Sequence, residues 1–324
     1  SQPTDSQSSL AFDTDVVVVG SGFGGSVAAH RLTGKGYRVT VLEKGGRWRP
    51  EDFPKSNWNI PKSFWFPRIG CRGIFGMRLL REALVLHGVG VGGGSLVYAN
   101  THFEPPQNVW DDPQWRGLED WRALMPAHYD TARRMLGVVE NPKLGPADEA
   151  LRRAAARRGR EQSFRPPAVG IYFGSPDVTV PDPYFGGDGP PRTGCTFCGG
   201  CMVGCRPGAK NTLDMNYLYL AEEAGARIVP DTEATLVEAL AGGGYRVHWR
   251  SSRGIRRALQ GTLTAGRVVL AGGVLGTVPL LMRCKELGAL PHLSDQLGNV
   301  VRTNSEALLG ITSKSRRDLW EGIA

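Results

Sequence analysis

The chain has 324 residues, of which 41% are hydrophobic and 22% charged, values ordinary for a globular protein that buries a core. Its net charge of +8 sits in short basic runs without interleaved aromatic side chains, so nucleic-acid binding is not expected. The sequence has no run of about 18 apolar residues, so no membrane span is predicted. Residues 1–9 are too polar for a secretory signal. Four cysteines packed between residues 195 and 205 do not resemble a secreted disulfide framework. We therefore expect a cytoplasmic protein, with peripheral attachment to an acidic membrane surface left open.

The first predicted elements have the order of a nucleotide-binding unit. Residues 15–19 read D-V-V-V-V, a pattern typical of a parallel strand buried on both faces. G-S-G-F-G-G follows at 20–25 and opens a predicted helix. A second strand over 37–42 then ends on Glu43. The order strand, glycines, helix, strand and acid predicts dinucleotide binding far more specifically than the glycines alone.

Each residue of this G-x-G-x-x-G loop has a predicted role. Gly20 permits the tight turn, Gly22 lets the backbone approach a pyrophosphate, and Gly25 lets helix and strand pack closely. The N–H groups at the start of the helix favour phosphate binding. Glu43 is expected to accept hydrogen bonds from ribose hydroxyls and to disfavour a 2′-phosphate, which argues against NADP.

Two further glycine-rich segments favour FAD over NAD. A plain NAD dehydrogenase would continue with short alternating strands and helices, whereas this chain enters an irregular stretch rich in Pro, Trp and Phe. H-G-V-G-V-G-G-G-S-L-V-Y-A-N follows at 87–100, and R-V-V-L-A-G-G stands at 267–273. A cofactor held at three distant loops is expected to be long, and residues 92–95 could supply backbone contacts to an isoalloxazine. Purely structural glycine turns are the alternative.

These segments together resemble the glucose–methanol–choline (GMC) oxidoreductases, and within them the bacterial cholesterol-oxidase-like branch. The similar pieces are G-S-G-F-G-G-S (20–26), L-E-K-G (42–45), the 87–100 loop, V-V-L-A-G-G-V-L-G-T (268–277) and L-G-N-V-V-R-T-N-S-E (297–306). The resemblance implies an α/β, FAD-binding two-dinucleotide-binding-domain fold, with a Rossmann-like parallel sheet and an interleaved, here incomplete, substrate domain. It also implies an enzyme that oxidises a small apolar alcohol, such as a sterol or another secondary alcohol, by hydride transfer to FAD.

The resemblance also implies specific FAD contacts. They are Gly20, Gly22, Phe23 and Gly25 at the pyrophosphate, Glu43 at the adenosine ribose, Gly94, Ser95 and Asn100 near the flavin, the Ala234 backbone at the adenine, and Gly272 and Gly273 at the flavin. In cholesterol oxidases proper an asparagine stands where this chain has Tyr98, so Asn100 is offset by two positions.

The expected domains are the first part of the FAD-binding domain at 13–105, a substrate-side insertion at 106–194, the second FAD-binding part at 195–305, and the start of the substrate domain at 306–324. The catalytic His and Asn that the resemblance implies would lie beyond residue 324, in a further segment or partner. No catalytic residue is assigned here, and His87 is the only histidine considered functional.

The cysteine run has the spacing C-x2-C-x2-C-x3-C, at Cys195, Cys198, Cys201 and Cys205. This spacing matches the bacterial ferredoxin pattern and predicts an iron–sulfur cluster, with Cys71 or Cys284 as substitute ligands or a three-iron form. Unliganded buried thiols, and zinc or disulfides, are the alternatives. A cluster would suit a flavin dehydrogenase that passes electrons to another acceptor. A flavin-binding electron-transfer subunit acting with a partner chain is a third hypothesis.

Overall fold

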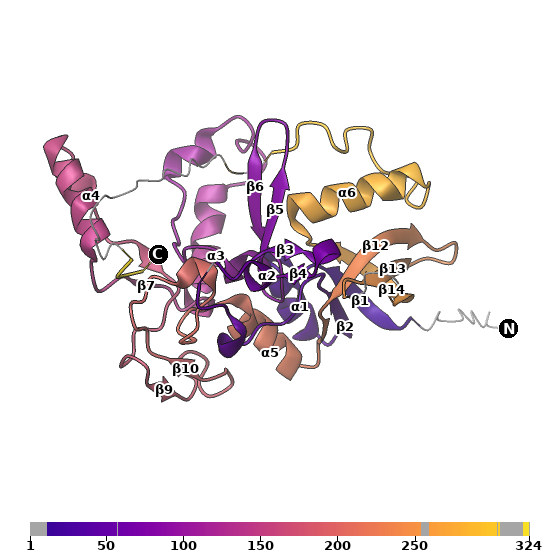
Figure 1. Ribbon diagram of the computed structural model, residues 1–324. Coiled ribbons are helices and arrows are strands. Elements are labelled where there is room, and N and C mark those ends of the chain that lie inside the picture. The colour runs from indigo at the N-terminus through magenta and orange to yellow at the C-terminus, as the bar shows by residue number, and fades with distance from the viewer. Residues whose placement is uncertain (1–11, 57, 254–258, 303, 305–319, 324) are drawn as a thin grey trace. The chain divides into compact units, whose positions relative to one another are not determined.

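A computed structural model describes residues 12–56, 58–253, 259–302, 304 and 320–323 (Figure 1). The chain divides into two compact units, Ser1–Arg47 with Ala221–Ser305, and Trp48–Leu220 with Glu306–Ala324. These divisions differ from the expected domain boundaries after residues 105 and 194, because the second glycine loop and the cysteine run pack together within one unit. Within the described ranges, no helix is long and apolar enough to cross a bilayer.

The first unit contains a six-stranded sheet in the order β11-β2-β1-β14-β13-β12. Its strands are β1 (Thr14–Val19), β2 (Val39–Leu42), β11 (Arg227–Val229), β12 (Thr232–Ala239), β13 (Tyr245–Ser251) and β14 (Gln260–Leu270). The four strands β11, β2, β1 and β14 pair in parallel, which confirms the predicted Rossmann-like sheet. β12, β13 and β14 add an antiparallel meander that the sequence analysis did not anticipate. β14 belongs to both parts of the sheet: its residue Ala265 pairs with Thr14 of β1 on one side and with Tyr245 of β13 on the other.

Helices cover both faces of this sheet. They are α1 (Phe23–Thr33), α5 (Tyr217–Glu223) and α6 (Gly273–Glu286). α1 contacts β1, β2 and β14, whereas α6 contacts β12 and runs over it in Figure 1. Val16 and Val18 share one core cluster with Ala29 of α1, and Val17 shares another with Leu280 of α6. Since side chains alternate across a strand, both faces of β1 are buried, and this explains its uninterrupted run of valines.

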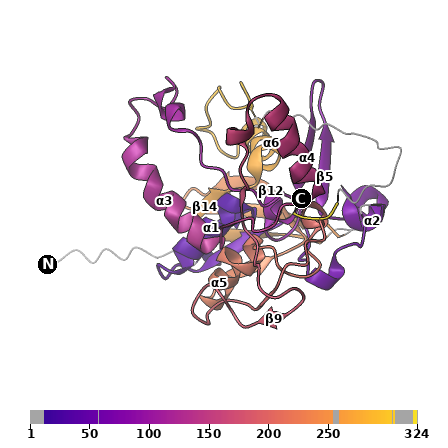
Figure 2. The same ribbon diagram turned by 90° about the vertical axis from the view of Figure 1, so that its left-hand side faces the viewer.

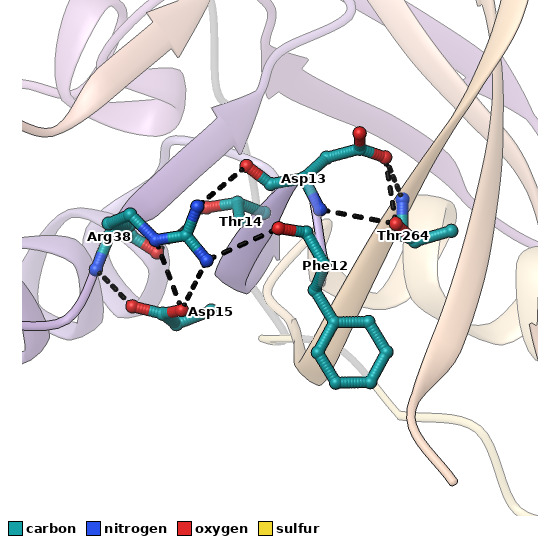
Figure 3. Close-up of polar contacts among 6 residues, drawn as sticks. All are labelled: Phe12, Asp13, Thr14, Asp15, Arg38 and Thr264. Carbon is teal, nitrogen blue, oxygen red and sulfur yellow. Dashed lines mark hydrogen bonds and ion pairs between the residues drawn. The ribbon is translucent and has the colours of Figure 1, made fainter. Parts of the chain in front are cut away.

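The entry into β1 is fixed by a network of polar contacts (Figure 3). The Arg38 guanidinium donates to Asp15 Oδ1 through Nε at 3.2 Å and Nη2 at 2.7 Å, and to the carbonyl oxygens of Phe12 and Asp13. The Asp13 carboxylate accepts hydrogen bonds from the backbone N–H and hydroxyl of Thr264 at 2.7 and 2.8 Å. These bonds lower the pKa of both carboxyls below the ordinary value. They fasten the start of β1 to the strands on its two sides.

The second unit has short elements and long connections. They are α2 (Ile60–Ser63), β3 (Trp65–Phe66), β4 (Cys71–Arg72), β5 (Phe75–Leu79), β6 (Leu84–Gly88), α3 (Trp121–Met135), β7 (Val139–Glu140), α4 (Pro146–Arg157), β8 (Ala168–Val169), β9 (Thr179–Val180) and β10 (Arg192–Thr193). β5 and β6 form a hairpin that extends as a two-stranded ribbon in both views (Figures 1 and 2). Trp110, Trp115 and Trp121 pack against one another with ring centroids 5.7–6.2 Å apart, and so form an aromatic cluster at the start of α3.

Most of the expected start of a substrate domain, residues 306–319 and 324, lies outside the described residues, as do residues 303, 305 and 306 of the 297–306 motif. Of the last segment, Gly322 is described: its N–H donates to the Phe197 carbonyl and its own carbonyl accepts from Gly199, both at 3.0 Å. This short segment therefore pairs with the cysteine run.

Candidate cofactor-binding site

The first glycine loop has the strained geometry that its predicted roles require. Gly20 has a φ of +98°, and a Cβ atom there would lie 2.5 Å from the carbonyl oxygen of Ala271. A Cβ atom on Gly25 would lie 1.9 Å from the carbonyl oxygen of Gly20. Neither position can hold a side chain without moving the backbone, so the tight turn and the close helix–strand packing are both present.

Gly22 has the opposite surroundings. It is the N-cap of α1, and a Cβ atom there would meet nothing within 4 Å. Gly24 in the first turn is equally open, and Phe23 exposes 42% of its surface. The first N–H groups of a helix have no acceptor within the helix, and the helix dipole is positive at this end. The open space at Gly22 is therefore suited to a phosphate group.

Glu43 lies beside this loop, directly after β2, and is buried. Its Oε2 accepts hydrogen bonds from the N–H and hydroxyl of Ser21 at 3.1 and 2.8 Å, and its Oε1 accepts from the N–H of Gly45 at 2.8 Å. Burial raises the pKa of this carboxyl, and the three hydrogen bonds act against that rise. Because a carboxylate has about four acceptor positions, these three bonds leave capacity for a ribose hydroxyl.

A cavity of about 380 Å³ lies at the start of β12, lined by Pro230, Asp231, Thr232, Trp249, Ser251, Arg253 and Leu259. Thr232, which lines this cavity, is bonded to the backbone of Glu43: the Thr232 N–H donates to the Glu43 backbone carbonyl at 2.7 Å. Ala234, the predicted adenine contact, pairs with Trp249 just before a register shift in β12, and does not line the cavity.

The third glycine loop meets the first. The N–H of Ala271 donates to the Val19 carbonyl at 2.8 Å, so β1 and β14 end side by side. Gly272 is the N-cap of α6, and Gly273 has a φ of +65° with open space around a Cβ atom. The sheet thus brings the predicted residues of the first and third loops to one edge.

The second glycine loop belongs to the other unit and folds around a 3₁₀ turn, Gly93–Leu96. Ser95 is fully buried; its hydroxyl donates to the Gly92 carbonyl at 2.7 Å and accepts from the Leu213 N–H at 3.0 Å. Gly94 accepts from the N–H groups of Val97 and Tyr98, both at 3.1 Å. These bonds give Ser95 and Gly94 a role in the shape of the loop.

Asn100, at the end of the second loop, is an unusual residue of the second unit. It is fully buried with a φ of +62°, and within the described part of the chain neither Oδ1 nor Nδ2 of its side chain has a hydrogen-bond partner. Leaving a buried polar group unpaired costs about 1–3 kcal/mol. The unpaired amide therefore has donor and acceptor capacity available for a polar ligand.

His87 and Tyr98 have mainly structural surroundings. The His87 ring covers Gly76, where a Cβ atom would lie 2.3 Å from its Cε1. The Tyr98 hydroxyl lies 3.2 Å from His102 Nε2, and burial raises the pKa of the tyrosine and lowers that of the histidine. His102 is half-buried and Lys210 is buried, and neither lies in a sequence motif that predicts its surroundings.

The thiols of the cysteine run are not arranged as the predicted metal site requires in the part of the chain that the structure describes. No three or more His, Cys, Asp or Glu side chains among the described residues are placed to hold a metal ion. All four cysteines of the run have free thiols: Cys195 and Cys201 are buried, Cys205 is half-buried and Cys198 is exposed. Burial raises the pKa of Cys195 to about 11 and also raises that of Cys205, which keeps both as neutral thiols.

Among the described residues, the geometry therefore gives no support to iron–sulfur or zinc ligation at Cys195, Cys198, Cys201 and Cys205. Cys195 and Cys201 pack with Val169 and Ile171 in a hydrophobic cluster, as small apolar residues do. The suggested substitute ligands lie elsewhere, Cys71 in β4 and Cys284 in the core of the first unit.

Two family models and several known proteins are similar to this chain. Residues 18–66 match the model of the NAD(P)-binding Rossmann-like domain, and residues 191–299 match that of the GMC oxidoreductases. A cholesterol oxidase of Mycobacterium tuberculosis is 48% identical over 96% of this chain and 55% of its own length. A cholesterol oxidase of Acinetobacter baumannii is 44% identical over 97% of this chain and 58% of its own. An FAD-dependent oxidoreductase from Chaetomium thermophilum has a TM-score of 0.48 and 18% identity, covering 83% of this chain and 47% of that one.

The glycine turn, the open helix N-terminus and the acid after β2 define a Rossmann-like dinucleotide-binding protein. The matches to the cholesterol oxidases extend over nearly the whole chain. The chain belongs to the GMC oxidoreductase family. It spans about half the length of the relatives it matches.

Proposed function

We propose that this chain binds FAD, with the pyrophosphate at the start of α1 and the adenosine ribose at Glu43. The open space at Gly22 carries the proposal, because Gly20 and Gly25 close the turn tightly on either side of it, while a Cβ atom at Gly22 would meet nothing within 4 Å. The cavity beside Thr232 and Asp231 is of a size suited to an adenine ring next to that ribose. The unpaired amide of Asn100 supports a second contact, to the flavin.

We further propose that the protein oxidises an apolar alcohol, with a sterol as the first candidate, because two relatives at 44–48% identity are cholesterol oxidases. Bound FAD would accept the hydride. The residues of this chain hold and orient the cofactor, and we assign the proton acceptor to none of them. Electron transfer through a metal cluster gains no support from the cysteines. We also propose a cytoplasmic location, with attachment to an acidic membrane surface as the alternative.

Release of FAD from the purified, heat-denatured protein tests the cofactor. We expect about one FAD per chain, measured by absorbance and chromatography. A folded protein that binds no FAD after incubation with an excess of it would refute the proposal. Oxidation of cholesterol, compared with that of a long-chain primary alcohol and a short-chain alcohol, then tests the substrate class in a protein that includes this chain.

A further inference from the structure

Lys210 is a buried lysine whose bonding capacity is completely used. Only 2% of its surface is exposed. Its Nζ donates to three backbone carbonyl oxygens, those of Leu96 at 3.2 Å, Tyr98 at 2.8 Å and Cys201 at 2.8 Å. An ammonium group has three donors, so each is matched by an acceptor. The Nζ atom also lies 4.7 Å from the centre of the Tyr98 ring, within cation–π range.

The three carbonyl groups belong to two different segments of the second unit. Leu96 and Tyr98 lie in the second glycine loop, and Cys201 lies in the cysteine run. Lys210 therefore links the second glycine loop to the cysteine run, although it is close in sequence only to the cysteine run.

Residues that follow Lys210 hold the same loop at two further points. The Leu213 N–H donates to the Ser95 hydroxyl at 3.0 Å. The Asn211 N–H donates to the Gly170 carbonyl at 2.9 Å, and the Gly170 N–H donates to the Asn100 carbonyl at 3.1 Å. The segment from Lys210 to Leu213 thus holds the second glycine loop at Ser95 directly and at Asn100 through Gly170.

Packing alone does not explain a lysine here. Burial of an ammonium group is costly unless it is well solvated by the protein, and a methionine of similar length would fill the same volume without that cost. Removal of the charge would leave the carbonyl oxygens of Leu96 and Tyr98 without these bonds, two to four residues before Asn100. The contribution specific to lysine is therefore the fixed position of these two carbonyl groups.

We propose that Lys210 is the positioning residue of the second glycine loop, and that it holds this loop in the conformation in which the Asn100 amide can bind the flavin. The inference rests on the proposed binding of FAD. Lys210 has no contact with the cofactor in this proposal; it acts through the Leu96 and Tyr98 carbonyls on Asn100.

The test compares the full chain with Lys210→Met, which keeps the length of the side chain and removes its donors. Lys143→Met is the matched control, because Lys143 is an exposed lysine of the same unit that lies over the Phe197 ring. Hydrogen exchange of the protein without FAD should accelerate at least about tenfold in residues 94–100 of Lys210→Met and stay unchanged in β1 and in Lys143→Met. FAD affinity should fall about tenfold in Lys210→Met only.

A double-mutant cycle with Asn100→Gly separates positioning from general stability. If Lys210 acts through Asn100, then Lys210→Met should change FAD affinity less than threefold when Asn100→Gly is already present. Equal effects of Lys210→Met in the two backgrounds would overturn the inference, as would native exchange rates in residues 94–100. If Lys210→Met does not fold, Lys210→Arg is tested instead. Because arginine keeps N–H donors at this position, the FAD affinity of Lys210→Arg should lie within threefold of the native value. A folded Lys210→Arg protein that binds FAD weakly would count against the inference. A native chain that folds but binds no FAD would refute the proposed function, while the exchange experiment would still decide the role of Lys210 in the loop.

Discussion

The carbonyl oxygen of Gly20 occupies the space that a Cβ atom of Gly25 would need, only 1.9 Å from its ideal position. The two glycines therefore depend on each other, and the start of α1 can approach the end of β1 only while Gly25 has no side chain. Gly22, between them in sequence, has no such neighbour. The structure thus separates Gly20 and Gly25, which serve the fold, from Gly22 and Gly24, which have open space around them.

This separation predicts different results for two substitutions. Gly22→Val should retain the native fold, with the free energy of unfolding changed by less than about 1 kcal/mol, because its φ of −68° suits any residue and the space is open. It should abolish FAD binding, because the side chain would occupy the path of the pyrophosphate. Gly25→Val should instead destabilise the fold by about 3 kcal/mol or more. Thermal unfolding and FAD titration measure both effects, and normal FAD binding by a folded Gly22→Val protein would contradict the prediction.

Asn100→Gly should make the protein without cofactor more stable and should weaken FAD binding. The substitution removes an unpaired buried amide and relieves a φ of +62°, and together these changes should raise the free energy of unfolding by about 1–2 kcal/mol. Loss of the ligand contact should raise the Kd for FAD about tenfold. Chemical denaturation without FAD, followed by fluorescence titration, checks the two signs. A less stable Asn100→Gly protein would mean that the amide already has a partner.

Glu43 predicts a pH dependence of stability. Burial raises its pKa above the ordinary value of 4.5, so the folded protein binds a proton more readily here than the unfolded chain does. The stabilising contribution is complete below pH 4.5 and is lost as the pH rises through the raised pKa. Denaturation of the native chain and of Glu43→Gln across pH 4–8 should therefore show the native chain losing stability relative to the variant as the pH rises, and the reverse slope would contradict the assignment.

The cysteines predict a pattern of thiol reactivity. In the native protein an alkylating reagent should modify Cys198, which is exposed, whereas Cys195 and Cys201 should react only after unfolding. Mass spectrometry after timed alkylation measures this order. Cys201→Ala should lower the free energy of unfolding by about 1–3 kcal/mol without changing FAD content. Stoichiometric iron and acid-labile sulfide in protein purified without oxygen would restore the cluster hypothesis.

Local sequence predicted the first unit well because its determinants are local. The valine run, the turn at Gly20 and the acid at Glu43 fall within 29 residues, and steric rules fix what each can do. The meander of β12–β14 was missed because its strands, with polar residues such as Arg246 and Arg250, do not have the apolar pattern of the parallel strands. The cysteine spacing does not decide between two outcomes, because four thiols at ferredoxin intervals can bind a cluster or pack as apolar groups. The bonds of Lys210 depend on two segments about a hundred residues apart in sequence, and no local pattern encodes them.

The network that fixes Asp13 to Thr264 joins residues 251 positions apart, and β1 pairs with β14 over the same interval. A ribosome that adds about 5–20 residues per second needs roughly 10–50 s to cover that distance. During this time β2 can already pair with β1, but the other edge of β1 and much of its apolar surface have no partner. The whole of the segment from Trp48 to Leu220 is translated meanwhile. The nucleotide-binding sheet therefore closes late in synthesis, after most of the second unit has left the ribosome. Until then Val16–Val18 lie on a strand with one unpaired edge, which exposes them to aggregation or to chaperone binding.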